Sequence, residues 1–254
     1  MSVIRSIGFC LLVGGGLWLS AMPVQAADLK IAITATTQRF SFVDEAGDRR
    51  GFNVAFIRAI CDRMGRSCEL ETQRFPQVIP LVAAGEADIG VANTLKTPER
   101  AEKVAFSVPY WRSTSSFVGL KGQPERATDG SRLPVCVVEA TRQKAFVEAY
   151  RAEDLTPLVV DSMKDLLANL KAGSCPLALL PTLQILSFLQ SEGGRPFDYV
   201  GRPLRDRGLG GDVHMVVRPD DPDLLSAVNE AIRSLIEDGT HEKLTRLYFP
   251  FGIL

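Results

Sequence analysis

The feature that most constrains the fold of this chain is an alternation of strand-like and helix-like segments that occurs twice. The first half alternates between apolar strand-like runs and segments with apolar residues at helical spacing, at 29–34, 53–64, 68–72, 75–84 and 88–92. The second half repeats the pattern, at 115–121, 134–138, 142–152, 157–160, 162–172 and 177–180. Such alternation is typical of a sheet flanked by helices. The sequence therefore predicts an α/β protein with two similar lobes.

Further elements follow the second unit. The segment 181–190 is predicted to be a helix with Pro181 in its first turn, where the missing N–H has no cost. Strands are then expected at 199–201 and 213–218, and two helices end the chain, at 222–236 and 241–248. Because structure continues beyond the second unit, we expect the chain to cross between the lobes twice.

The first 26 residues have the features of a secretory signal peptide. Arg5 supplies a positive charge, 7–19 is an apolar run too short to span a bilayer, and Val24 and Ala26 are small residues at the positions that a cleavage site requires. An uncleaved membrane anchor is the alternative interpretation. We expect the mature protein to be periplasmic.

Charge and composition exclude several kinds of partner. Without Arg5, the 29 basic residues of the chain become 28 against 30 acidic ones, a net charge of about −2. This balance argues against nucleic acid or an anionic membrane surface as a partner. The two histidines, His214 and His241, have no cluster of metal ligands around them in the sequence, so no metal site and no cofactor are predicted.

Four cysteines remain after removal of the leader, an even number in an oxidising compartment. Cys61 and Cys68 lie one short loop apart, between a predicted helix and a predicted strand, and a local disulfide is expected there. Cys136 and Cys175 each lie at a predicted strand of the second half, and parallel neighbours could bring them together. A second disulfide is therefore predicted between them.

An arginine follows the strand predicted at 88–92. That strand leads into a polar loop, the sequence TPER then opens a helical turn, and Thr97 is placed to cap it. Arg100 can present two parallel N–H donors to the two oxygens of a carboxylate, which a lysine cannot do. The alternative is a solvated cluster in which Arg100 only accompanies Glu99 and Glu102.

This segment and much of the rest of the chain resemble the family 3 periplasmic solute-binding proteins, the amino-acid-binding components of ABC transporters. The resemblance is carried by GFNVAFIRAICDRMG, by TPER with the following FSVPY, and by the ending NEAIRSLIEDGTHEKLTRLYF. It implies a type II periplasmic binding protein fold, with a central sheet flanked by helices in each lobe and two hinge crossings. We expect lobe 1 to comprise 27–112 and 214–254, and lobe 2 to comprise 113–213.

The resemblance also implies a set of ligand-binding residues. In the family the arginine of the TPER-like motif, here Arg100, clamps the ligand's carboxylate, and Asn93 and Thr94 at the strand end are candidate partners. Many members have a ligand-binding Ser or Thr where this chain has Leu95. In the second half, Thr141 and Arg142 precede a helix whose N–H groups favour an anion.

A loop rich in aromatic residues supplies two more candidates. Arg39 and Phe40 lie where relatives often place a ring that covers the ligand side chain, whereas Phe42 is assigned to the core. The mature chain also resembles binders that usually act as monomers.

Pro181 is the most consequential departure from the family pattern, because amino-acid binders of the family commonly have an aspartate there for the α-ammonium. Glu139, Asp161 or Asp212 could supply a carboxylate from elsewhere. The three candidate arginines without such a carboxylate suggest a carboxylate ligand, even a dicarboxylate, rather than a standard α-amino acid.

We therefore expect a non-enzymatic binding protein that captures a small carboxylate-bearing solute, an amino acid or organic acid, between its lobes and delivers it to the permease of an ABC transporter. No nucleophile–base pair or glycine-rich phosphate loop is evident in the sequence. Two alternatives remain open. One is a periplasmic dehydratase acting on a cyclic carboxylate with Glu139 as its acid or base, and the other is an accessory binding protein of a periplasmic quinoprotein dehydrogenase.

Overall fold

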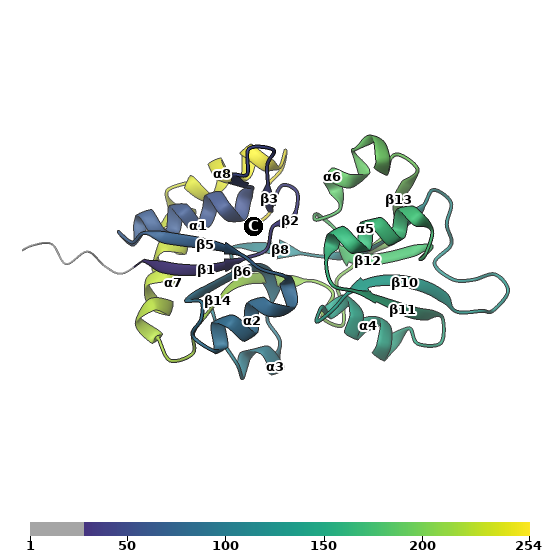
Figure 1. Cartoon of the computed structure of the whole chain (residues 1–254), viewed down its shortest axis with the longest axis horizontal. Helices are drawn as coiled ribbons and strands as arrows, with labels where there is room; N and C mark the ends of the chain where they lie inside the picture. The colour runs from purple at the N-terminus through teal and green to yellow at the C-terminus, as the bar shows by residue number, and fades with distance from the viewer. Residues whose placement is uncertain (1–27) are drawn as a thin grey trace, which may run out of the picture.

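The computed structural model describes residues 28–254, which form two lobes, each built on its own β-sheet (Figure 1). This confirms the two-lobed α/β architecture predicted from the sequence. The predicted leader, residues 1–26, lies outside the described residues. Within 28–254 no helix combines the length and the apolar composition that crossing a membrane requires.

The first lobe contains a six-stranded mixed sheet. Its strands are β1 (Leu29–Ile33), β5 (Cys68–Thr72), β6 (Ile89–Leu95), β7 (Ala105–Phe106), β8 (Trp111–Ser113) and β14 (Gly211–Val217). The order is β5–β1–β6–β14–β7, with β8 also paired to β14. β1 is parallel to β5 and β6, whereas β14 is antiparallel to β6.

Helices cover both faces of this sheet. They are α1 (Phe52–Arg63), α2 (Phe75–Ala83), the short α3 (Pro98–Ala101), α7 (Pro222–Glu237) and α8 (Thr240–Tyr248). α1, α7 and α8 pack on one face and α2 on the other. Ile31 and Ile33 of β1 belong to the first of these cores and Ala32 to the second, because successive side chains of a strand point to opposite faces.

The second lobe repeats this arrangement with five strands. They are β9 (Ser115–Leu120), β10 (Leu133–Val138), β11 (Leu155–Val160), β12 (Leu177–Pro181) and β13 (Phe197–Leu204), in the order β11–β10–β12–β9–β13. β10 is parallel to β11 and β12, and β9 is antiparallel to β12 and β13. α4 (Arg142–Tyr150) and α5 (Met163–Ala172) pack on opposite faces, and α6 (Leu186–Leu189) follows β12.

A small antiparallel sheet joins β1 to α1. It consists of β2 (Thr36–Thr37), β3 (Ser41–Val43) and β4 (Arg49–Arg50). Gly51 follows it and begins α1 with a φ of 116°; a Cβ there would lie 2.3 Å from the carbonyl oxygen of Phe40. Only glycine fits this close approach, which holds the start of α1 against the loop.

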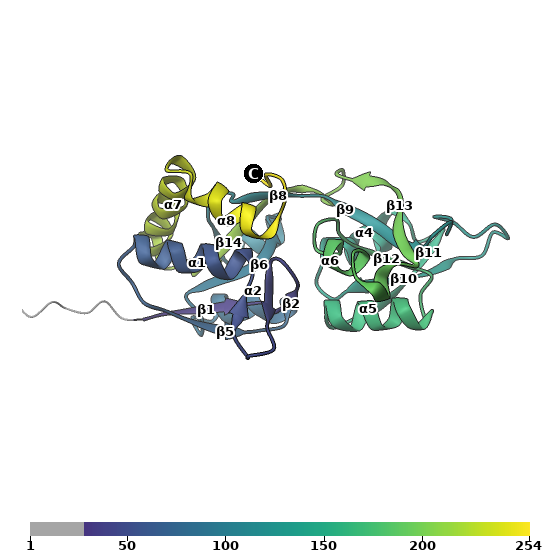
Figure 2. The same cartoon turned by 90° about the horizontal axis from the view of Figure 1, so that it is seen from above.

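The chain passes between the lobes twice, at one side of the molecule (Figure 2). β8 ends at Ser113 in the first sheet and β9 begins at Ser115 in the second; the return runs from β13, which ends at Leu204, to β14, which begins at Gly211. Gly211 is paired with Ser113, so the two crossings lie side by side. Rotation about these segments would change the angle between the lobes.

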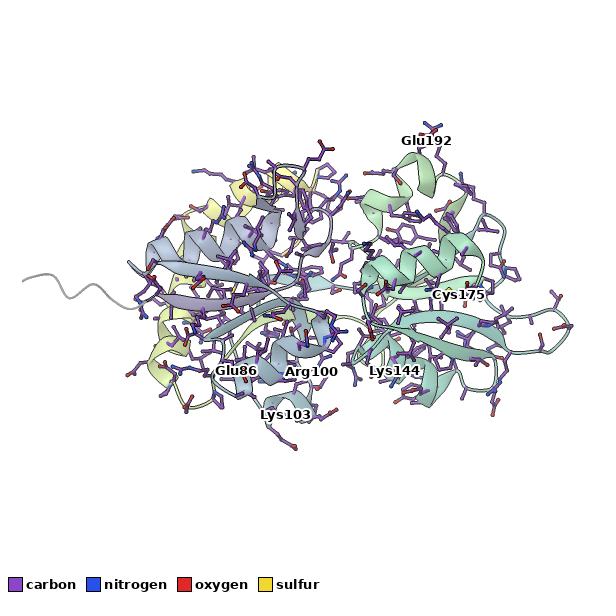
Figure 3. All side chains as sticks on the ribbon, in the orientation of Figure 1. Glu86, Arg100, Lys103, Lys144, Cys175 and Glu192 are labelled. Atoms are coloured by element: carbon purple, nitrogen blue, oxygen red, sulfur yellow. A yellow bond between two sulfur atoms is a disulfide. The ribbon has the colours of Figure 1, made fainter. Side chains whose placement is uncertain are left out.

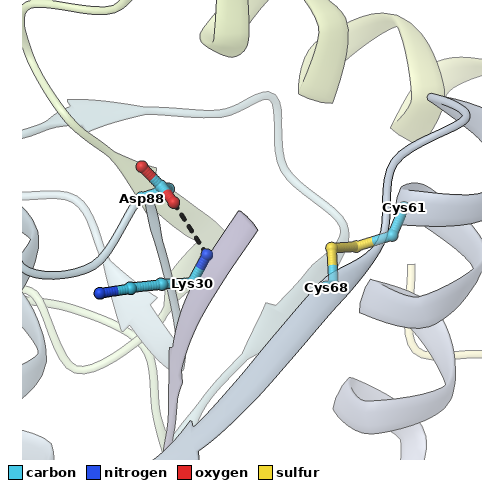
Figure 4. Close-up of a disulfide and its surroundings, with 4 residues drawn as sticks. All are labelled: Lys30, Cys61, Cys68 and Asp88. Carbon is cyan, nitrogen blue, oxygen red and sulfur yellow. Dashed lines mark hydrogen bonds between the residues drawn. A yellow bond between two sulfur atoms is a disulfide. The ribbon is translucent and has the colours of Figure 1, made fainter. Parts of the chain in front are cut away.

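Both predicted disulfides are present. Cys61 near the end of α1 bonds to Cys68 at the start of β5, with the Cα atoms 6.2 Å apart (Figure 4). Cys136 of β10 bonds to Cys175, just before β12, at a Cα separation of 5.8 Å. The second bond forms because β10 and β12 are parallel neighbours, as the sequence suggested.

The prediction for Pro181 was wrong. It does not open a helix of residues 181–190; instead it ends β12, where it is paired with Ser115 of β9, and helical structure begins only at Leu186. The apolar run of β12 continues for one residue more than expected because the neighbouring β9 extends the ladder to this position. Pro181 therefore lies at the C-terminal end of a central strand of the second sheet.

Candidate functional site

A cavity lies between the two lobes, at the edges where the parallel strands end. The empty space between its walls is about 790 Å³, counting the part open to solvent. The first lobe contributes residues that follow β1 and β5 or end β6, among them Thr34, Arg74, Asn93 and Leu95. The second lobe contributes residues that follow β10 and β11 or end β12, among them Thr141, Ser162 and Pro181. Ligands of α/β proteins commonly bind at such strand ends.

Arg100 crosses from the first lobe to the second. It lies in α3, where the Thr97 hydroxyl accepts a hydrogen bond from its backbone N–H, as predicted, at 3.2 Å. Its Nη1 donates to the carbonyl of Leu95 at 2.8 Å and its Nη2 donates to the carbonyl of Ala140, in the second lobe, also at 2.8 Å. The guanidinium lies over the ring of Phe75, 5.6 Å from its centroid, at the edge that faces the second lobe (Figure 3).

Burial and a neighbouring cation act on Arg100. Loss of solvent, followed by the positive charge of Arg142, lowers the pKa of Arg100 from 12.5 to about 10. The guanidinium therefore stays charged at neutral pH, but its surroundings favour the charge less than water does. An anion placed between the two arginines would relieve both effects.

Asn93 lines the cavity, whereas Thr94 does not. Asn93 has a φ of 56°, and its Oδ1 accepts hydrogen bonds from Trp111 Nε1 at 3.2 Å and Asn53 Nδ2 at 3.0 Å. Since the indole N–H can only donate, the amide oxygen of Asn93 points into the lobe. Thr94 is only 1% exposed, and its hydroxyl has no hydrogen-bond partner among residues 28–254.

Thr141 and Arg142 begin α4 on the opposite wall. The Thr141 hydroxyl donates to the carbonyl of Val138 at 2.6 Å and accepts from the backbone N–H of Lys144 at 3.2 Å, so it caps the helix. The preceding residue, Ala140, has a φ of 58°, which orients its carbonyl for the bond from Arg100. Thr141 and Arg142 therefore lie directly across the cavity from Arg100.

The Arg142 guanidinium is held in place but incompletely satisfied. Its Nη2 donates to the carbonyl of Arg207 at 3.3 Å, in the segment that returns to the first lobe. Gly208 allows this position, because a Cβ on Gly208 would lie 2.2 Å from Nη2. The Nε of Arg142 is buried and has no hydrogen-bond partner within the described part of the chain.

The structure places two other predicted residues outside the cavity lining. Arg39 joins the lobes at another point: its Nε donates to Ser187 Oγ at 2.9 Å, its Nη2 to Gln190 Oε1 at 2.6 Å, and its Nη1 to the carbonyl of Tyr248 at 2.6 Å. Phe40 is fully buried in the core of the first lobe, 4.7 Å from Trp111 between ring centroids.

The assignment of Phe42 rather than Phe40 to the core was wrong. Phe42 is half-buried and lies in β3, where it is paired with Thr36 and Arg50 of the neighbouring short strands. Phe40 precedes this strand in a turn that points its ring inward, with its N–H bonded to the carbonyl of Thr37. Neither ring covers the cavity.

The sequence interpretation missed Arg74 and Ser162. Arg74 lies between β5 and α2, and its Nη1 donates to Asp161 Oδ2 of the second lobe at 3.2 Å. Ser162 caps α5 by accepting from the backbone N–H of Asp165. Each lies two residues after the end of a parallel strand, and this position in the chain is the signal that would have found them.

Comparison with known families agrees with this two-lobed arrangement. The model of the bacterial extracellular solute-binding proteins, family 3, matches residues 29–251. The chain belongs to this family. The resemblance noted in the sequence is thereby confirmed, and the family is one of binding proteins rather than enzymes.

Several characterised members are similar over nearly their whole length. The lysine/arginine/ornithine-binding periplasmic protein of Escherichia coli strain K12 is 27% identical over 252 residues, covering 97% of each chain. An L-arginine-binding protein of Pseudomonas aeruginosa is 27% identical, covering 94% of this chain and 96% of its own. A Salmonella typhimurium periplasmic binding protein of high arginine specificity shares the fold, with a TM-score of 0.82, 22% identity, and coverage of 88% of this chain and 100% of its own.

The cavity of this solute-binding protein has cations but no acid among its lining residues in 28–254. The three carboxylates considered as substitutes are all ion-paired: Asp161 with Arg74 at 3.2 Å, Glu139 with Lys144 at 3.4 Å, and Asp212 with Arg112 at 2.8 Å. The described part of the chain also contains no group of three His, Cys, Asp or Glu residues arranged to hold a metal ion.

Proposed function

We propose that this family 3 protein is a periplasmic binding component that captures a small carboxylate-bearing solute, an amino acid or organic acid, between its lobes and delivers it to the permease of an ABC transporter. The observation that carries the proposal is the position of Arg100. Its guanidinium lies in the cavity wall of one lobe and reaches the backbone of the other, at the carbonyl of Ala140. A carboxylate bound there would contact groups of both lobes and favour their closure.

The relatives support the general class of solute. Two of them are named for the binding of arginine, lysine or ornithine, and all of these are α-amino acids with a carboxylate. The shared carboxylate is the part of such a ligand for which this cavity has a partner. The side chains that we propose to bind it are Arg100, Asn93, Thr141 and Arg142.

Thr94, Arg39 and Phe40 have other roles in this proposal. Thr94 is buried beneath the cavity wall, Arg39 joins the lobes, and Phe40 supports the core. We place the two points at which the chain passes from one lobe to the other around Thr114 and at 205–210, close to the predicted crossings. Residues 1–26 would direct the chain to the periplasm, where it would act as a monomer.

Solute binding by the refolded protein tests the proposal. The protein is unfolded in guanidinium, dialysed and refolded to remove any carried solute, then titrated calorimetrically with the common L-amino acids and small organic acids at neutral pH. We expect at least one carboxylate to bind, and Arg100→Met to weaken its binding about 100-fold, because a charge-assisted pair of hydrogen bonds is lost.

Lys103→Met is the matched control. Lys103 carries the same charge three residues further on, is largely exposed, and forms one ion pair among the described residues, with Glu99 at 3.9 Å. Its replacement should leave the affinity unchanged. If no carboxylate binds to folded protein, or if the two variants behave alike, the proposal fails.

The two alternative functions differ in support. Glu139, the candidate catalytic acid of a dehydratase, is paired with Lys144 and does not line the cavity, so nothing in the site favours that reaction. An accessory role beside a quinoprotein dehydrogenase stays a prediction. The neighbouring genes would separate it from transport.

A further inference from the structure

We infer that the solute of this protein carries two anionic groups and no ammonium group, with one anionic group bound by Arg100 and the other by Arg142. This inference rests on the proposed function, because it names the class of solute that the same cavity binds. It separates this protein from relatives named for cationic amino acids.

The side chains that line the cavity have an excess of positive charge. Arg74, Arg100 and Arg142 line the cavity, and no carboxylate does so within residues 28–254. Arg74 is compensated by Asp161, with which it forms an ion pair at the edge of the cavity. In the described part of the chain neither Arg100 nor Arg142 forms an ion pair. Two cations therefore remain without an ion-pair partner in one partly buried space, and the charge of Glu99 acts on Arg100 less than burial and Arg142 do. This favours a solute with two negative charges.

The two arginines belong to opposite walls of the cavity. Arg100 belongs to the first lobe, and its Nη2 reaches the carbonyl of Ala140, only two residues before Arg142 of the second lobe. The positive charge of Arg142 is also felt by Arg100, whose pKa it helps to lower. A solute with an anionic group at each end would be held by one lobe at each end and would remove this repulsion on closure.

The guanidinium of Arg142 has hydrogen-bond donors that are not satisfied by the described residues. Among residues 28–254, its Nε is buried without a hydrogen-bond partner, and its Nη2 has the 3.3 Å bond to Arg207 alone. A buried guanidinium donor without an acceptor is costly. The carbonyl of Arg207 holds Nη2, and Gly208, which has no side chain, leaves room for the guanidinium beside it. The Nη donors that remain can reach an acceptor in the cavity.

An ammonium group would have no charged partner here. In the second lobe, β12 ends at the cavity wall with Pro181, which offers no side-chain acceptor. Glu139 is paired with Lys144 and is not among the described residues that line the cavity. The hydroxyl and amide groups of the lining are neutral acceptors. A solute cation would therefore be placed beside two guanidinium groups without a compensating carboxylate, which costs binding free energy.

Matched pairs of acids test the inference. Malonate, succinate, glutarate and adipate are titrated into the refolded protein by calorimetry, and each is compared with the amino acid of the same carbon skeleton, from aminomalonate to L-2-aminoadipate; L-arginine is included. We expect one dicarboxylate to bind at least 10-fold more tightly than its amino counterpart. Arg142→Met should weaken that dicarboxylate about 100-fold and leave the affinity for the monocarboxylate of the same length unchanged.

Arg132→Met is the control, since Arg132 is an exposed arginine of the same lobe that donates a hydrogen bond to the carbonyl of Ala152, outside the cavity. Circular dichroism establishes that each variant is folded, and Arg142→Lys, which keeps the charge, should restore part of the affinity. Tighter binding of an amino counterpart or of L-arginine would overturn the inference but support the proposed function. Equal effects of the Arg142 and Arg132 replacements would also overturn it. Failure of every carboxylate to bind would overturn both.

Discussion

The two lobes have the same sheet arrangement, but the edges that they turn toward the cavity differ in chemistry. In the first lobe the wall is supported by a hydrogen-bond network in which Asn93 accepts from Asn53 and Trp111. In the second lobe the corresponding strand β12 ends in Pro181, and polar groups of the wall come from the starts of α4 and α5. The fold determines where a solute binds, whereas the residue types at the strand ends determine which solute.

The lobes also differ in how their disulfides constrain the chain, and this predicts the largest effect. Replacing Cys136 and Cys175 by alanine should lower the free energy of unfolding by about 4 kcal/mol, because loop closure in the unfolded chain becomes less restricted. The sequence separation is 39 there and 7 for Cys61 and Cys68, whose replacement should cost about 2 kcal/mol. Hydrogen exchange resolved by lobe measures both values, and equal losses would contradict the comparison.

A carboxylate at the end of β12 should give the cavity the acidic partner that an amino acid's ammonium group needs. Pro181→Asp is expected to weaken dicarboxylate binding about 100-fold, or about 3 kcal/mol, by placing a negative charge in the cavity wall. The same change should strengthen binding of the amino counterpart. Pro181→Asn, which lacks the charge, is the control, and calorimetry that shows the same loss for both variants would refute the electrostatic explanation.

The hydrogen-bond network around Asn93 predicts that substitutions in the first lobe's cavity wall reduce stability more than the equivalent substitutions in the second lobe's wall. Asn93→Ala removes the acceptor of two buried donors and leaves a residue with a Cβ at a φ of 56°, so a loss of about 2–3 kcal/mol is expected. Asn93→Gly should recover about 1 kcal/mol by accepting the backbone conformation. Pro181→Ala, the equivalent truncation in the second lobe, should cost less than about 1 kcal/mol. Denaturant titration distinguishes the three variants.

The two arginines should be distinguishable by pH. Anion binding requires a charged Arg100, whose pKa is lowered to about 10, so affinity should be constant below that pH and fall about tenfold per pH unit above it. In Arg142→Met the fall should begin at higher pH, because the neighbouring charge that lowers the pKa is gone. Calorimetric titrations from pH 8 to 11 measure this, and an unchanged profile in the variant would show that the two arginines do not interact.

Helix caps at the cavity predict the smallest effects. Thr141→Ala should destabilise the second lobe by about 1 kcal/mol, because the first turn of the nine-residue α4 loses its side-chain acceptor. Thr97→Ala should cost about 0.5 kcal/mol, since α3 has only four residues to lose. Thermal unfolding compares the two, and a larger effect of Thr97→Ala would show that its cap matters beyond its own helix.

Much of the fold could be predicted because its signals are local. Apolar runs, helical spacing, and the glycines Gly85 and Gly173 after α2 and α5 located most elements, and both of these glycines have the positive φ expected there. The disulfide between Cys136 and Cys175 followed from the parallel order of two strands. The end of β12 was missed because its extension to Pro181 depends on pairing with Ser115, 66 positions away in the chain.

The site was less predictable because the direction of a side chain depends on tertiary contacts. Arg39 has the chemistry of an anion-binding residue, but Ser187, Gln190 and the Tyr248 carbonyl take its donors. Arg74 has the same chemistry and reaches the cavity, and only its position directly after β5 distinguishes it in the sequence. A rule based on strand ends would have found Arg74 and rejected Phe40.

The Arg39 bonds have a consequence for the timing of exchange. Two of them join the lobes directly, to Ser187 and Gln190, without passing through a solute. They should therefore slow reopening and lengthen the residence time of a bound solute, but they should also favour closure of an empty molecule by the same free energy. A partner that recognises the closed form would then also bind some protein without solute. Weakening the Arg39 bonds would speed solute release, but it would improve the partner's discrimination between loaded and unloaded protein.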